Sequence, residues 1–200
     1  MLTTMSKTTL LCTLMHLLVD GLCACCLYMA VGAFDFSAFA GIFITYNVLA
    51  FLRQPLTGVA ADYAVKKSNL LALTAVAALS VAVFMASVAT LFPMPRKAIL
   101  FCVAISLGVG DSLFHVLDGK RVALHTHNYI RALGVFVSTG AMGLAIGMVF
   151  ASWMLLYVLL VAIALTTVVS GGSFGQTIVL VLLVLLKKDG KNTYQVLWGD

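Results

Sequence analysis

Two pairs of ionisable residues with the same spacing lie inside apolar stretches of the sequence. His16 and Asp20 are four residues apart, and so are Asp111 and His115. If these stretches are helical, the members of each pair lie on one helical face, one turn apart. A histidine beside an aspartate can exchange a proton near neutral pH, so the pattern indicates a proton-titrating or substrate-binding cluster. The alternative interpretation is a set of fixed hydrogen bonds that holds two helices together.

The composition around these pairs is that of a membrane protein. The chain has 200 residues, of which 62% are hydrophobic and 10% are charged, and its mean hydropathy is +1.12. A soluble domain usually carries about 25% charged residues. This chain has too little polar side-chain surface to cover a globule, so we expect lipid to be its solvent. An ionisable group then costs several kcal/mol unless it faces a cavity or a partner.

Six apolar runs are each near the ~20 residues that cross a bilayer. They cover residues 8–32, 37–57, 69–92, 97–118, 129–150 and 152–170. A shorter run, 177–186, is typical of a re-entrant or interfacial segment, or is the start of a seventh helix. The predicted fold is all-α: a polytopic bundle of six transmembrane helices in residues 1–170, followed in 171–200 by a short hydrophobic segment and a polar tail.

The positions of lysine and arginine predict the orientation, because cytoplasmic loops are enriched in both. With six crossings and a cytoplasmic N-terminus, ten of the 12 basic residues fall inside, and only Arg96 and Lys97 fall outside. A seventh crossing would change this to seven against five. The predicted location is therefore the plasma or inner membrane, with the N-terminus in the cytoplasm. Spans one to three and four to six then form inverted repeats, as in many secondary transporters, with the His/Asp pairs on equivalent helices.

Several other functions are not expected. The sequence lacks a P-loop, an HExxH motif and a paired CxxC set, so no enzyme and no cofactor is predicted. The run Cys23-Ala24-Cys25-Cys26 is better explained by packing than by a metal site, because Cys25 and Cys26 point to different helix faces. His125-Thr126-His127 is interpreted as a solvated loop. Basic residues lie in short gaps between apolar runs, which is a topology signal and argues against nucleic acid as a partner.

Glycines recur along the fifth predicted span. Gly143 and Gly147 form a small-xxx-small pattern that allows two helix backbones to approach closely. We therefore predict a helix-packing role for the four glycines of this span: Gly134, Gly140, Gly143 and Gly147.

The segment between the second and third spans resembles a family motif. It reads Gly58-Val-Ala-Ala-Asp62-Tyr-Ala-Val-Lys66-Lys67 and resembles the signature loop of the major facilitator superfamily, Gly-x-x-x-Asp-(Arg/Lys)-x-Gly-(Arg/Lys)-(Arg/Lys). The glycine would permit close helix approach, the aspartate would pair or cap, and the basic pair would anchor the cytoplasmic face. Tyr63 and Val65 depart from the motif.

Further segments resemble the branch of this superfamily related to fosmidomycin-resistance exporters. His16-Leu-Leu-Val-Asp20 is similar to their first helix, and Asp111-Ser-Leu-Phe-His115 to their fourth. The segment from Gly134 to Gly143 resembles their fifth-helix motif, although Thr139 replaces its usual proline. The resemblance covers residues 8–170, which would be the N-terminal six-helix half of a twelve-helix transporter.

This resemblance implies a half-size secondary active transporter in the lipid bilayer that works by alternating access, as an efflux antiporter for a small organic molecule. His16, Asp20, Asp111 and His115 would line its central cavity, with Asn47 as a further contact, and the loop from Gly58 to Lys67 would take part in gating. The second bundle would be another copy of the chain or a separate half. The alternative is a non-transporting half-length remnant or accessory subunit, in which the charged pairs are inherited structure.

Overall fold

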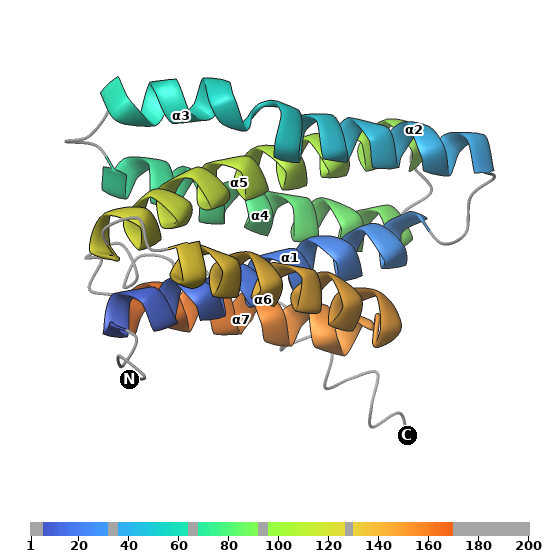
Figure 1. Cartoon of the computed structure of the whole chain (residues 1–200). Helices are drawn as coiled ribbons and strands as arrows, with labels where there is room; N and C mark the ends of the chain where they lie inside the picture. Colours follow the sequence, from blue (N-terminus) through green and yellow to red (C-terminus); the bar gives the residue numbers. More distant parts are fainter. Residues whose placement is uncertain (1–5, 32–35, 64–67, 92–95, 127–129, 170–200) are drawn as a thin grey trace.

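Every element in the described part of the chain is helical. The computed structural model describes residues 6–31, 36–63, 68–91, 96–126 and 130–169. Its elements are α1 (Lys7–Val31), α2 (Phe36–Asn47), the π-helix η1 (Val48–Leu52), α3 (Gln54–Tyr63), α4 (Ser68–Leu91), α5 (Arg96–His125), α6 (Ile130–Val149) and α7 (Trp153–Val169). They lie side by side as a bundle in which α1, α4 and α6 run opposite to α5, α7 and the α2–α3 stretch (Figure 1).

Several of these helices have the length and composition of membrane spans. Four are long and apolar enough to cross a bilayer, namely α1, α4, α5 and α6. Two shorter apolar stretches are Phe39–Leu52 and Trp153–Thr167. In lipid every backbone N–H and C=O must be satisfied within the segment, so apolar runs of this length become helices. The structure supports the prediction of an all-α, multi-pass membrane protein.

The predicted count of six helices is not confirmed. Each predicted span falls on a helical stretch, but the described residues form seven α-helices and the short η1. The second predicted span is the one that is divided. The backbone N–H of Arg53 donates to the carbonyl of Val48 at 3.2 Å, which closes a wider π turn just before Pro55. The predicted segment 177–186, and with it the region 171–200, lies outside the described residues.

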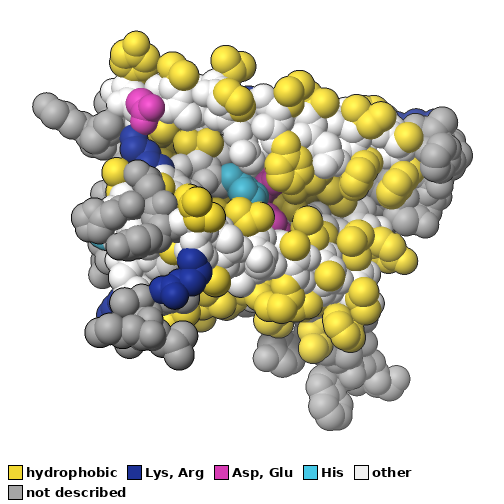
Figure 2. Space-filling model, viewed as in Figure 1, with side chains coloured by type: hydrophobic (Ala, Val, Ile, Leu, Met, Phe, Trp, Pro, Cys, Tyr) yellow, Lys and Arg dark blue, Asp and Glu magenta, His cyan; other side chains and the backbone are white. Residues whose placement is uncertain are grey.

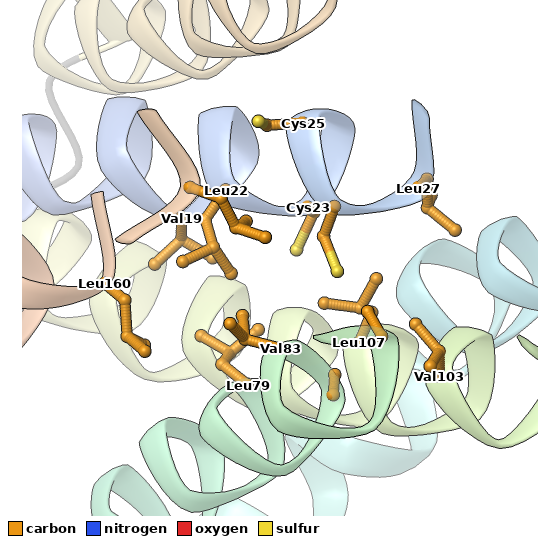
Figure 3. Close-up of a cluster of buried hydrophobic side chains, with 14 of the residues drawn as sticks. Val19, Leu22, Cys23, Cys25, Leu27, Leu79, Val83, Val103, Leu107 and Leu160 are labelled. Carbon is orange, nitrogen blue, oxygen red and sulfur yellow. The ribbon is translucent and has the colours of Figure 1, made fainter. Parts of the chain in front are cut away.

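Helices α1 and α5 form the middle of the bundle. Helix α1 packs most extensively against α6 and also against α5 and α7, whereas α5 packs against α4 and against the α2–η1–α3 stretch. The apolar core fills the space between them. Figure 3 shows Val19 and Leu22 of α1 directed toward Leu79 and Val83 of α4, with Leu107 of α5 beside them. These five side chains are at most 2% exposed.

Glycines allow α1 and α6 to approach at backbone distance. A Cβ at Gly143 would collide with the carbonyl oxygen of Leu17, and one at Gly147 with that of Gly21. Gly134, in contrast, faces open space. Close approach of this kind brings residues 136–140 of α6 beside the polar residues of α1.

Candidate functional site

The four predicted ionisable residues meet where α1 and α5 cross. Nε2 of His16 lies 2.7 Å from Nε2 of His115. The carboxylate of Asp20 lies next to both rings, with Oδ2 at 3.2 Å from Nε2 of His16 and Oδ1 at 3.5 Å from Nε2 of His115. Asp111 lies behind His115, with Oδ1 at 3.1 Å from its Nδ1. We call these four residues the His/Asp cluster.

The outer nitrogens of the two histidines are held by acceptors. Nδ1 of His16 lies 2.6 Å from the carbonyl oxygen of Phe136 on α6. Nδ1 of His115 lies 2.9 Å from the carbonyl oxygen of Asp111. On the other side of Asp111, the hydroxyl of Tyr46 donates to Oδ2 at 3.0 Å. Four helical segments therefore fix the orientation of the cluster: α1, α2, α5 and α6.

The cluster is buried except at one edge. Asp111 is 0%, His16 3% and Asp20 4% exposed, whereas the side chain of His115 is 12% exposed. The ring of His16 stacks on Phe136 with centroids 4.2 Å apart. Figure 2 shows histidine atoms in a recess of an otherwise largely apolar face, with acidic atoms beside them. The cluster therefore opens to this face.

The two carboxylates of the cluster are paired with histidines. Among the described residues, the ion pairs of Asp20 and Asp111 involve only histidines. One oxygen of each, Oδ1, is buried without a hydrogen-bond partner in the same part of the chain. The nearest arginine along α5 is engaged elsewhere, since Nη1 of Arg121 lies 3.0 Å from Oδ1 of Asp118.

Asn47, predicted as a further contact, lies apart from the cluster. Its amide donates to the carbonyl of Phe43, one turn back along α2, at 2.8 Å. The preceding residue, Tyr46, reaches Asp111 instead. The sequence carries a signal for this contact, because a tyrosine inside an apolar span needs a partner for its hydroxyl. What it does not show is which residue of the Tyr46-Asn47 pair faces α5.

The predicted gating residues are placed only in part. Asp62 near the end of α3 forms an ion pair with Lys120 of α5. Gly58 does not support close helix approach, since a Cβ there would have no neighbour within 4 Å. Lys66 and Lys67 lie outside the described residues.

A cavity of about 260 Å³ lies between α1, α4, α5 and α7. Asp118 and Arg121 line it among mostly apolar side chains, but no member of the His/Asp cluster does. Access to the cluster therefore runs through the face at His115 and not through this cavity.

Cys25 of α1 does not lie on the same side of the helix as Cys23. The thiols of Cys23, Cys25 and Cys26 are free and buried. Cys25 points away from Cys23 on the opposite side of the helix (Figure 3), and its thiol donates to the carbonyl of Ser152 at 3.6 Å. Packing explains these residues.

Comparisons of the chain with family models, with curated proteins and with solved structures find no match. The fold and the site together define a class: a multi-pass helical membrane protein whose central helices hold a buried histidine–aspartate cluster that opens to one face.

Proposed function

We propose that the chain is one helical bundle of a secondary active transporter that resembles half of a major facilitator and works by alternating access. The observation that carries this proposal is the His/Asp cluster. Ionisable groups at membrane depth are costly and mark substrate or ion pathways. Four of them converge here on the two central helices and open, through His115, to one face of the bundle.

The packing of the helices supports an inverted repeat. If α1, α2–α3 and α4 are exchanged for α5, α6 and α7, the extensive α1–α6 contact becomes the contact of α5 with the α2–η1–α3 stretch. The α1–α7 contact likewise becomes the α4–α5 contact. Each of these helix–helix contacts therefore has its counterpart in the structure. The two His/Asp pairs lie on α1 and α5, which exchange with one another. Repeats of this kind place transport sites near the middle of the bilayer.

A second bundle accounts for the open face. Without one, the His115 side of the cluster would meet lipid, where a charged group costs at least about 2.5–3.5 kcal/mol. The residues around the recess are apolar, as Phe51 shows: its ring centroid lies 6.1 Å from that of His115, and it is 44% exposed. A second copy of the chain or another six-helix half would cover this face and form the pathway between the two bundles.

Alternating access can be tested without knowing the substrate. Phe51→Cys is introduced in a Cys102→Ser background, since Cys102 is the exposed native thiol of the described residues. A membrane-impermeant maleimide is then added to right-side-out and to inside-out vesicles. Alternating access predicts labelling from both sides, because the pathway beside the cluster opens to each side in turn.

Phe84→Cys is the matched control for this experiment. Phe84 is 58% exposed and lies on α4, away from the cluster. It should stay unlabelled from both sides because maleimide reacts with thiols in water. Labelling of Phe51→Cys from one side only, or from neither, would contradict the proposal and favour a non-transporting membrane subunit.

A further inference from the structure

If both histidine rings are neutral, their facing Nε2 atoms form an arrangement that lacks a positive charge. The outer nitrogen of His16 faces the carbonyl of Phe136, and that of His115 faces the carbonyl of Asp111. A carbonyl oxygen has no proton to give, so each Nδ1 must carry the hydrogen and donate it. In the neutral rings both Nε2 atoms then present lone pairs, although they lie only 2.7 Å apart.

The carboxylate of Asp20 adds a third acceptor at the same point. Its oxygens lie at 3.2 and 3.5 Å from the two Nε2 atoms, and Oδ1 is buried with no hydrogen-bond partner among the described residues. With both rings neutral and Asp20 ionised, three acceptors thus face one another inside a buried site. Either a proton on one of these groups or a metal ion must lie between them.

The geometry points to a site for a divalent transition-metal ion, held by His16, Asp20 and His115. One ligand atom from each of these residues lies within 4.8 Å of the others. Metal–nitrogen and metal–oxygen distances near 2.0–2.2 Å require ligand atoms roughly 3.4 Å apart in a tetrahedron. The two histidine nitrogens would have to separate by less than about 1 Å from their present 2.7 Å.

The surroundings of the three ligands also fit a metal. Histidines that bind metals nearly always donate their other N–H to a carbonyl or a carboxylate, which fixes the ring. His16 does so to Phe136, and His115 to Asp111, whose carboxylate is held in turn by Tyr46. Two imidazoles and one carboxylate favour borderline ions such as Zn²⁺, Co²⁺ and Fe²⁺. The fourth position would be left for water or for a group from the second bundle.

Gly140 is part of the same arrangement. A Cβ at this position would overlap Nε2 of His16 and Oδ2 of Asp20, so the glycine leaves room for the ligands beneath α6.

The inference rests on the proposed function only for the role of the ion, as cargo or as coupling ion. Metal binding is measured without transport, and the maleimide experiment uses no metal. A failure of metal binding can therefore be distinguished from a failure of alternating access.

The test measures binding of Zn²⁺ and Co²⁺ to the purified full chain in detergent micelles. His125→Gln and His127→Gln are introduced first, because His-x-His can bind metal adventitiously. We expect one ion per chain and the visible absorption bands of Co²⁺ in a tetrahedral site, which Zn²⁺ then displaces. His16→Gln, His115→Gln and Asp20→Asn should abolish binding, and Asp111→Asn should weaken it by about 10–100-fold.

Two further variants keep the test decisive. Asp62→Asn, which removes an exposed carboxylate outside the cluster, should bind like the parent. His115→Cys retains a ligand at that position and should add a thiolate-to-cobalt charge-transfer band. The proposal is overturned if the folded parent binds no metal, since a proton alone then fills the gap. It is equally overturned if the histidine variants bind normally, or if His115→Cys binds Co²⁺ without the thiolate band.

Discussion

The hydroxyl of Tyr46 and the carboxylate of Asp111 show how single polar atoms behave inside this bundle. Asp111 is wholly buried, and Tyr46 is 3% exposed. A buried acceptor that loses its donor keeps the cost of desolvation without the compensating hydrogen bond. The net strength of this hydrogen bond is therefore modest, but its removal would be costly because it would leave the buried Asp111 carboxylate without a donor.

Tyr46→Phe tests this contact. The variant keeps the ring and removes only the hydroxyl that donates to Asp111 at 3.0 Å. We expect the free energy of unfolding to fall by about 1–3 kcal/mol, measured by denaturant titration in mixed micelles. Tyr28→Phe is the control, because Tyr28 is 55% exposed, and it should change stability by less than about 0.5 kcal/mol. Equal effects of the two substitutions would show that the Tyr46–Asp111 bond contributes nothing particular.

At the scale of elements, the contact between α1 and α6 depends on the absence of side chains. The obstacles to a Cβ at Gly143 and Gly147 are backbone atoms of Leu17 and Gly21, which cannot turn aside as a flexible side chain can. The two helices would have to separate. Such a separation would also move the Phe136 carbonyl that holds His16.

Gly143→Ala and Gly134→Ala form a matched pair of substitutions on one helix. A methyl group at Gly143 overlaps α1, so we expect the free energy of unfolding to fall by about 1–3 kcal/mol. A methyl group at Gly134 meets no neighbour within 4 Å. There alanine should be neutral or stabilise the helix by up to about 1 kcal/mol. The same denaturant titration compares them, and a loss at Gly134 as large as that at Gly143 would contradict the packing argument.

For the whole molecule, the distribution of charge predicts how the bundle lies in the membrane. In the structure, Lys120 and Arg121 near the end of α5 lie at the same end of the bundle as the start of α1 (Figure 1). Cytoplasmic ends collect basic residues. We therefore expect this end to face the cytoplasm.

Reporter fusions measure the orientation. Alkaline phosphatase inserted after residue 94, between α4 and α5, should be active because that connection is predicted to lie outside. Green fluorescent protein fused to the C-terminus should fluoresce, which also tests the prediction that the segment 177–186 does not cross. An active phosphatase at the C-terminus would indicate a seventh crossing, and inactivity after residue 94 would reverse the orientation.

Much of this protein could be inferred from its sequence because lipid limits what a chain can do. Apolar runs of membrane length have to be helical, so all-α structure and the places of the helices follow from hydropathy alone. The spacing of His16 with Asp20, and of Asp111 with His115, likewise puts each pair on one face. These inferences concern single helices, for which periodicity is sufficient.

Only the tertiary structure decided how the helices face one another. Periodicity does not show that Tyr46 rather than Asn47 faces Asp111, or that Gly140 lies over the ligands while Gly134 faces open space. Nor does it show the π turn that divides the second predicted span, because such a turn leaves composition unchanged. The two His/Asp pairs could be predicted one by one. That His16, Asp20 and His115 face one another depends on where α1 and α5 cross, and long-range packing determines that crossing.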